Sequence, residues 1–174
     1  GAFAERVAIP TRNLIEIPDG MDASLAALTE PAATATHAVN LAERSLARPI
    51  SETRSLVIGG GSVGLFAALT LAHRGVKDLT LADTNPLRRQ SAEKTGVADV
   101  INPIDTPVTD AGFDLVVDAV GGKATRQASV AAVTPGGVIM HIGLMDNDGG
   151  IDVRRLTLQE ITFIGTYTYT PLDL

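Results

Sequence analysis

The chain has 174 residues, of which 45% are hydrophobic, so its length and composition suit one domain with a core of its own. Its net charge is −6 and it has no basic cluster that could neutralise a phosphate backbone, which argues against nucleic acid as a partner. It has no cysteine, which excludes disulfides and cysteine-ligated metals for this piece.

The first 54 residues predict one strand, two helices and a connection. Residues 3–9 have β character and predict a strand. Asp22 is a suitable N-cap for a first helix, and Pro31 suits the opening turn of a second helix that runs to about residue 44. Residues 48–54 are expected to form a surface connection.

From residue 56 onward, strands and helices alternate. The predicted strands are residues 56–58, 79–82, 100–101, 115–117, 138–142 and 161–167, the last at a sheet edge. The predicted helices are residues 62–74, 86–94, 123–133 and 153–159, with a turn at Pro135-Gly136-Gly137. Apolar strands without polar alternation are typical of sheets that are covered on both faces. The pattern therefore predicts an α/β fold with a doubly wound, parallel, six-stranded sheet.

Residues 55–73 carry no formal charge and approach the length of a membrane span. Four glycines in the first half of this stretch interrupt it, so we predict a short strand and a helix here instead of a membrane helix. No N-terminal signal pattern is present, and we expect a cytoplasmic protein.

The segment Gly59-Gly60-Gly61-Ser62-Val63-Gly64 follows a predicted strand and opens a predicted helix. Gly59, Gly61 and Gly64 have the spacing of a dinucleotide-binding loop: the first allows a tight turn, the second lets a pyrophosphate approach the backbone, and the third lets helix and strand pack closely. The free N–H groups near Ser62 and Val63 would then bind the phosphates. The alternative is a glycine-rich turn without a ligand, and the strand and helix around it favour the binding loop.

Asp83 ends the next predicted strand, about 20 residues beyond the glycines, where this motif places an acid. A carboxylate here can accept hydrogen bonds from the adenosine ribose and would repel a 2′-phosphate, so NAD is preferred over NADP. The alternative is an acid that caps a turn. Arg88 could stack on adenine or weaken the discrimination against a 2′-phosphate, whereas Arg89 is interpreted as a solvated helix cation.

These segments, in this order, resemble the medium-chain, zinc-dependent alcohol dehydrogenase family. The resemblance is also carried by Thr95-Gly96-Val97-Ala98-Asp99-Val100-Ile101-Asn102-Pro103, Phe113-Asp114-Leu115-Val116-Val117-Asp118-Ala119-Val120-Gly121 and Pro135-Gly136-Gly137. The resemblance implies that residues 1–20 are the tail of a catalytic domain, 21–50 are connecting helices and 51–174 form an NAD-binding Rossmann domain. We therefore expect a piece of a longer protein.

The resemblance also implies roles for residues outside the glycine motif. It places Ala119, Val120 and Gly121 against the adenosine side and ribose of NAD, and Ile142, Gly143 and Leu144 near the nicotinamide ribose. Simple βα turns are the alternative for both segments.

Glu30-Pro31 is similar to a pair that lies at the catalytic zinc in the polyol and threonine branches of this family. A helix-entry acid stabilised by the helix dipole fits Glu30 equally well. His37 is interpreted as a structural histidine, and His141 as a core or edge residue and not a base. Residues 146–152 miss the EF-hand spacing and are interpreted as a mobile acidic loop.

The resemblance implies a parent enzyme that moves hydride between a secondary alcohol, of the polyol or sugar alcohol class, and NAD. Zinc would act as a Lewis acid there, with its main ligands outside this chain, so this piece alone would be inactive. A zinc-free quinone reductase of the same superfamily, a methyltransferase and a non-catalytic NAD-binding regulator remain alternatives. The sixth strand is predicted to pair with a second copy and form a homo-oligomer, most simply a dimer.

Overall fold

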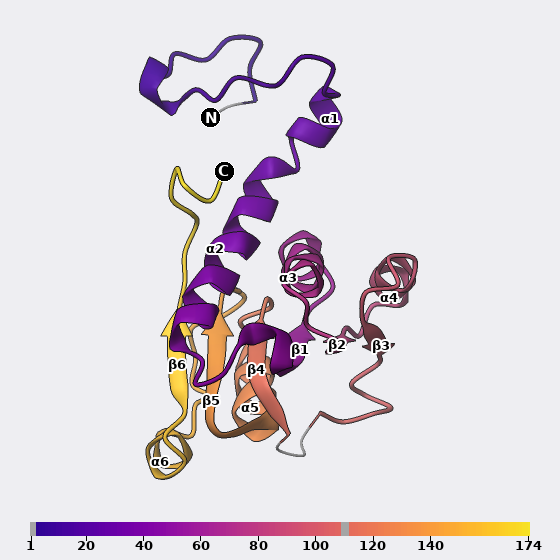
Figure 1. Ribbon diagram of the computed structural model, residues 1–174, viewed down its shortest axis with the longest axis vertical. Coiled ribbons are helices and arrows are strands. Elements are labelled where there is room, and N and C mark those ends of the chain that lie inside the picture. Colours follow the sequence, from indigo (N-terminus) through magenta and orange to yellow (C-terminus); the bar gives the residue numbers. More distant parts are fainter. Residues whose placement is uncertain (1–2, 109–111) are drawn as a thin grey trace.

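The computed structural model describes residues 3–108 and 112–174, and within them six strands form one parallel sheet (Figure 1). The strands are β1 Arg54–Ile58, β2 Asp78–Ala82, β3 Asp99–Ile101, β4 Phe113–Asp118, β5 Val133–His141 and β6 Thr162–Gly165. Their order is β3-β2-β1-β4-β5-β6, and each neighbouring pair is parallel. The predicted fold class is confirmed, including the edge position of the sixth strand.

Helices cover both faces of this sheet. They are α1 Ala23–Ala26, α2 Thr29–Ser45, α3 Ser62–His73, α4 Pro86–Glu93, α5 Lys123–Ala132 and α6 Val153–Leu158, with short 3-10 turns at η1 Thr11–Asn13 and η2 Ile50–Glu52. Because successive strand residues point to opposite faces, Val57 packs with α2, α3 and α4 while its neighbour Leu56 packs with α5 and α6. The strands are thus buried on both sides, as their unbroken apolar runs predict.

Local capping chemistry sets the predicted helix ends. The Asp22 side chain accepts hydrogen bonds from the amides of Ser24 and Leu25 at the start of α1. Asn85 does the same at the start of α4, which has Pro86 in its first turn. Gly75 follows α3 with a φ of +92°, a conformation that favours glycine after a helix.

The structure corrects four local predictions. Residues 3–9 form no strand, because no strand among the described residues pairs with them, and their side chains are exposed. Helix α2 begins at Thr29, two residues before the predicted start, since the first helical turn tolerates a proline at Pro31. Residues 48–54 are not wholly a surface connection, because Ile50 and Thr53 are buried and β1 already begins at residue 54. Pro135-Gly136-Gly137 forms a bulge inside β5 instead of a turn before it.

The uncharged stretch 55–73 is divided as predicted between β1, the glycine segment and α3. Among the residues that the structure describes, no helix is both long and apolar enough to span a bilayer. In Figure 1 the segment before α2 lies at the top, on the side toward which β5 and β6 point, and it exposes apolar side chains there.

Candidate functional site: a glycine-lined crevice at the carboxyl edge of the sheet

The glycine loop, residues 59–64, joins β1 to α3 and requires glycine at two positions for packing reasons. Gly59 has a φ of +101°, and a Cβ there would lie 2.7 Å from Cγ2 of Val120. A Cβ on Gly64 would lie 1.8 Å from the carbonyl oxygen of Gly59, so the helix could not approach the strand. The predicted turn and packing roles of these two residues are therefore supported by the geometry.

Gly61 is different, because a Cβ at this position would meet no atom within 4 Å. Its φ of −71° and ψ of −175° are also open to any residue. Nothing inside the protein therefore requires a glycine at residue 61. What the missing side chain provides is open space outside the loop, where a ligand could reach the backbone.

The backbone amides beside this open space fall into two groups, those with a partner and those without one among the residues that the structure describes. Gly59 donates to the carbonyl of Ala82 at 2.8 Å, and Gly60 donates to Oδ2 of Asp83 at 2.6 Å. Within residues 3–108 and 112–174, by contrast, no acceptor pairs with the N–H groups of Ser62 and Val63 in the first turn of α3. Such amides, together with the partial positive charge of a helix N-terminus, attract an anion.

Asp83 lies next to the loop, at the end of β2, and is only 6% exposed. One carboxylate oxygen accepts the Gly60 N–H, and the other accepts the N–H of Asn85 at 2.6 Å. Nη1 of Arg88 lies 3.8 Å from Oδ2, with its side chain half exposed. Arg89 is not simply solvated, because its Nη1 donates to the carbonyls of Asp83 and Thr84 and so fixes this turn.

The opposite wall is the turn of residues 119–121 after β4. It is held by Asp118, a fully buried acid that the sequence analysis did not single out. Oδ1 of Asp118 accepts the amides of Val120 and Gly121 at 3.0 and 2.8 Å, and Oδ2 accepts the Thr125 hydroxyl at 3.0 Å. A strand-ending aspartate with a glycine three residues later is the available sequence signal for such a turn.

The segment after β5 runs directly against this turn. A Cβ on Gly121 would lie 1.9 Å from the carbonyl oxygen of Gly143, so the two backbones are in contact. Ile142 is buried beneath this crossing, whereas Leu144 is 77% and Met145 is 71% exposed. Met145 is a second residue that the sequence analysis missed, because its position depends on this contact between turns.

These walls enclose a crevice of about 240 Å³. It is lined by Gly59, Gly61, Ser62, Val63, Gly64, Arg88, Ala119, Val120 and Met145. It lies beyond the carboxyl ends of β1 and β4, the point where the strand order reverses and where open α/β sheets bind ligands. Asp83 adjoins the crevice through its hydrogen bond with Gly60. Four other predicted residues do not line the crevice itself but continue its wall along the ends of β4 and β5: Gly121, Ile142, Gly143 and Leu144.

A family model described as "Zinc-binding dehydrogenase" matches residues 62–174. The chain belongs to the zinc-binding dehydrogenase family. An L-threonine 3-dehydrogenase from Streptomyces avermitilis is 30% identical over 175 aligned positions, which cover 96% of this chain and 49% of the relative. The chain thus spans about half the length of the curated relatives it matches.

Solved structures share the fold of this chain. Acetophenone reductase from Geotrichum candidum, solved with NAD, superimposes with a TM-score of 0.83 at 27% identity. The match covers 94% of this chain and 46% of the reductase chain. 2R,3R-butanediol dehydrogenase from Bacillus subtilis shares the fold, with a TM-score of 0.77 at 23% identity. This match covers 91% of this chain and 46% of the butanediol dehydrogenase chain.

The described residues do not by themselves make up a zinc site. Glu30 is exposed in the first turn of α2, and the described residues contain no group of three or more His, Cys, Asp and Glu side chains that could hold a metal. Protein zinc sites take three or four such ligands. Glu30 as a zinc ligand therefore stays a prediction from the sequence.

The histidines have structural surroundings. Nδ1 of His37 lies 2.9 Å from Oδ2 of Asp173, which ties the C-terminal segment to α2. His141 packs its ring on Phe163 with centroids 5.5 Å apart, and its Nε2 lies 3.8 Å from Oδ2 of Asp118. These positions agree with the interpretation of both as structural residues.

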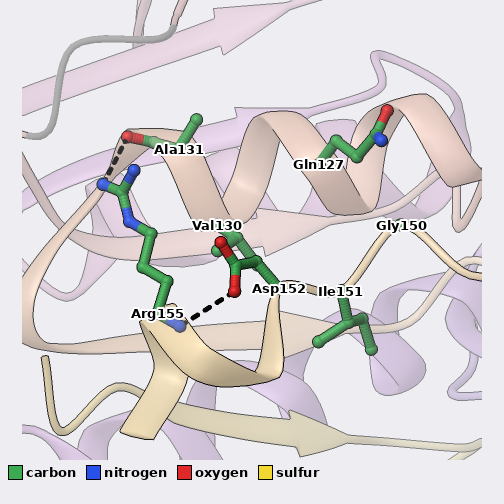
Figure 2. A pocket seen from close by; sticks show the side chains of 7 residues that line it. All are labelled: Gln127, Val130, Ala131, Gly150, Ile151, Asp152 and Arg155. Atoms are coloured by element: carbon green, nitrogen blue, oxygen red, sulfur yellow. Dashed lines mark hydrogen bonds between the residues drawn. The ribbon is translucent and has the colours of Figure 1, made fainter. Parts of the chain in front are cut away.

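A separate hollow of about 310 Å³ lies between α5 and α6, away from the glycine loop (Figure 2). Its charged groups are already paired: the Arg155 guanidinium donates to the carbonyl of Ala131 at 3.1 Å, and Asp152 accepts the Arg155 amide at 2.9 Å. Intramolecular hydrogen bonds thus hold both side chains, and the crevice at the glycine loop remains the better candidate site.

Proposed function

We propose that this chain is the NAD-binding domain of a zinc-dependent dehydrogenase that transfers hydride between a secondary alcohol, of the polyol or sugar alcohol class, and NAD. The observation that carries the proposal is the pair of Ser62 and Val63 amides, for which no described residue is an acceptor, beside a glycine, Gly61, whose missing side chain leaves open space. A diphosphate is the group of a dinucleotide that such a site would accept.

The rest of the crevice orders the cofactor along the sheet edge. With the diphosphate at α3, the adenosine ribose would reach Asp83 after β2, and its hydroxyls would donate to that carboxylate. The other half of the dinucleotide would then extend toward the turns after β4 and β5. NAD supplies the redox step when bound, and the residues of this chain bind and orient it.

Asp83 supports a preference for NAD over NADP. Its buried carboxylate is fixed by the amides of Gly60 and Asn85, so it cannot easily turn away from a 2′-phosphate. Arg88 offers a compensating positive charge only 3.8 Å away. We therefore expect NAD to bind more tightly than NADP, by a factor that Arg88 reduces.

The substrate class rests on relatives. L-threonine and 2R,3R-butanediol, which appear in the names of two relatives, each contain a secondary hydroxyl group. The zinc that would polarise this hydroxyl needs ligands beyond this chain, with Glu30 as one candidate. A dimer through β6 and a cytoplasmic location stay predictions from the sequence.

Calorimetric titration with NAD and NADP, applied to the wild type and Asp83→Asn, tests the proposal. Loss of a charged acceptor should weaken NAD binding by about tenfold and narrow the preference over NADP. Asp78→Asn is the matched control, because it removes an exposed acid at the other end of the same strand and should change neither affinity. Equal affinities of the wild type and Asp83→Asn for both cofactors would remove Asp83 from the site.

Two outcomes would favour the alternatives instead. Tighter binding of NADP by the wild type would favour a zinc-free quinone reductase of the same superfamily. Tight NAD binding by the full-length protein, without turnover of any polyol when zinc is supplied, would favour a non-catalytic NAD-binding regulator.

A further inference from the structure

Arg126 on α5 is a buried arginine, 4% exposed, whose five N–H donors are all used. Nε donates to the carbonyl of Gly149 at 2.7 Å, and Nη1 donates to the carbonyls of Gly121 and Asp146 at 2.8 and 3.0 Å. Nη2 donates to the carbonyl of Asp148 at 2.8 Å and to the Asp146 carboxylate. One side chain thus joins the turn after β4 to residues 143–149 after β5, which we name the strap.

The strap has further bonds to the same turn. The amides of Met145 and Asp146 donate to the carbonyls of Val120 and Gly121 at 3.1 and 3.2 Å. The second carboxylate oxygen of Asp146 accepts the amide of Lys123 at 3.1 Å, at the start of α5. The strap is therefore held from both sides, and the interpretation of residues 146–152 as a mobile acidic loop is corrected over the part that Arg126 binds.

The Arg126–Asp146 pair explains why the strap keeps this path. A buried guanidinium is costly unless its donors are satisfied, so releasing the strap would leave Arg126 charged and unpaired. The contact with Arg126 also holds the pKa of the Asp146 carboxyl below its usual value. Asp146 therefore stays ionised at neutral pH and remains a charged partner for the buried guanidinium.

The strap carries Met145 to the crevice, where it forms part of the lining, and leaves Leu144 exposed beside it. If the adenosine lies at Asp83 and the diphosphate at Ser62, the remaining nucleoside must cross toward β4 and β5, which is the side where the strap lies. The strap would form a wall for that half and not for the adenosine half.

We propose that Arg126, through Asp146, is a positioning residue that presets the strap as the wall for the nicotinamide half of NAD. This inference rests on the proposed function. It makes a distinction between ligands: the nicotinamide half of NAD would lie along the strap, whereas ADP, which contains only the adenosine and the diphosphate, would meet the strap at Met145 alone. Loss of the pair should therefore weaken NAD binding and spare ADP binding.

The test measures the affinities of the full-length protein for NAD and for ADP, together with its thermal midpoint. Arg126→Lys keeps the charge but cannot span the same acceptors. Asp146→Ala removes the side-chain anchor while leaving Arg126 its backbone acceptors, so it is the variant expected to keep the fold. Asp148→Ala is the matched control, because Asp148 contributes only its backbone carbonyl to Arg126.

We expect Asp146→Ala and Arg126→Lys to weaken NAD binding about tenfold and to change ADP binding by less than about twofold. The control Asp148→Ala should change neither affinity. The positioning role would be overturned if Asp146→Ala left the NAD affinity unchanged. It would also be overturned if the affinities for NAD and ADP fell equally and the thermal midpoint fell with them. Wild-type protein that binds neither ligand would refute the proposed function itself. Wild-type binding of both, with no separation in the variants, would refute only this inference.

Discussion

Gly61→Ala is the substitution that separates ligand binding from folding most cleanly. The new Cβ would meet no protein atom within 4 Å, and the backbone angles of Gly61 suit any residue. Replacing glycine reduces the entropy of the unfolded chain and favours folding by about 0.4–1 kcal/mol, while alanine is a poorer helix N-cap than glycine by a similar amount. The free energy of unfolding should therefore change by less than about 1 kcal/mol.

The same methyl group would stand in the space where a diphosphate must approach Ser62 and Val63. We expect NAD affinity to fall at least about tenfold, or 1.4 kcal/mol, and further in Gly61→Val. Gly64→Ala is the contrasting variant, because its Cβ would lie 1.8 Å from a backbone oxygen and should cost about 1–3 kcal/mol of stability.

Urea unfolding and calorimetric NAD titration measure the two effects separately. NAD affinity within about twofold of the wild type in both Gly61 variants would show that the loop does not hold the diphosphate. A large loss of stability in Gly61→Ala would show instead that the loop packs differently from the structure.

Three other predictions concern stability and assembly. Burial alone would raise the pKa of Asp173, but hydrogen bonds, led by the Thr170 hydroxyl, lower it to about 2. Because this pKa is lowered in the folded state, Asp173 contributes to folding stability above about pH 4, and this contribution is lost as the pH falls toward 2. The difference in unfolding free energy between the wild type and Asp173→Asn, at most about 2 kcal/mol, should therefore shrink between pH 4 and pH 2. Asn85→Ala removes the cap of α4 and should cost about 1 kcal/mol in urea unfolding, and an unchanged midpoint would contradict the capping role. Sedimentation at high concentration should show a dimer formed through the edge strand β6, and a monomer would count against that pairing.

The sequence was most informative where structure depends on neighbouring residues. The glycine loop and the N-cap Asp22 each follow from local backbone chemistry, and the structure places them as predicted. Asp83 was also predicted, because a parallel sheet brings the end of the next strand beside the loop. The alternation of strand and helix then left few possible strand orders.

Contacts between distant segments could not be read in the same way. Arg126 looks like an ordinary helix cation in the sequence, since four of its five acceptors are backbone carbonyls brought to it by turns. Met145 owes its position to the close crossing of Gly121 and Gly143, and the role of Asp118 depends on the amides that the next turn brings to its carboxylate. The strand predicted at residues 3–9 failed for a related reason, because β character alone does not provide a partner strand.

The central claim is that amides in the first turn of α3 hold the diphosphate of NAD. Amide chemical shifts followed during an NAD titration test it directly, since each backbone N–H reports separately. The account predicts that the signals of Ser62 and Val63 move most, and that ADP moves them in the same direction. Saturation with NAD that leaves both signals unmoved would contradict it.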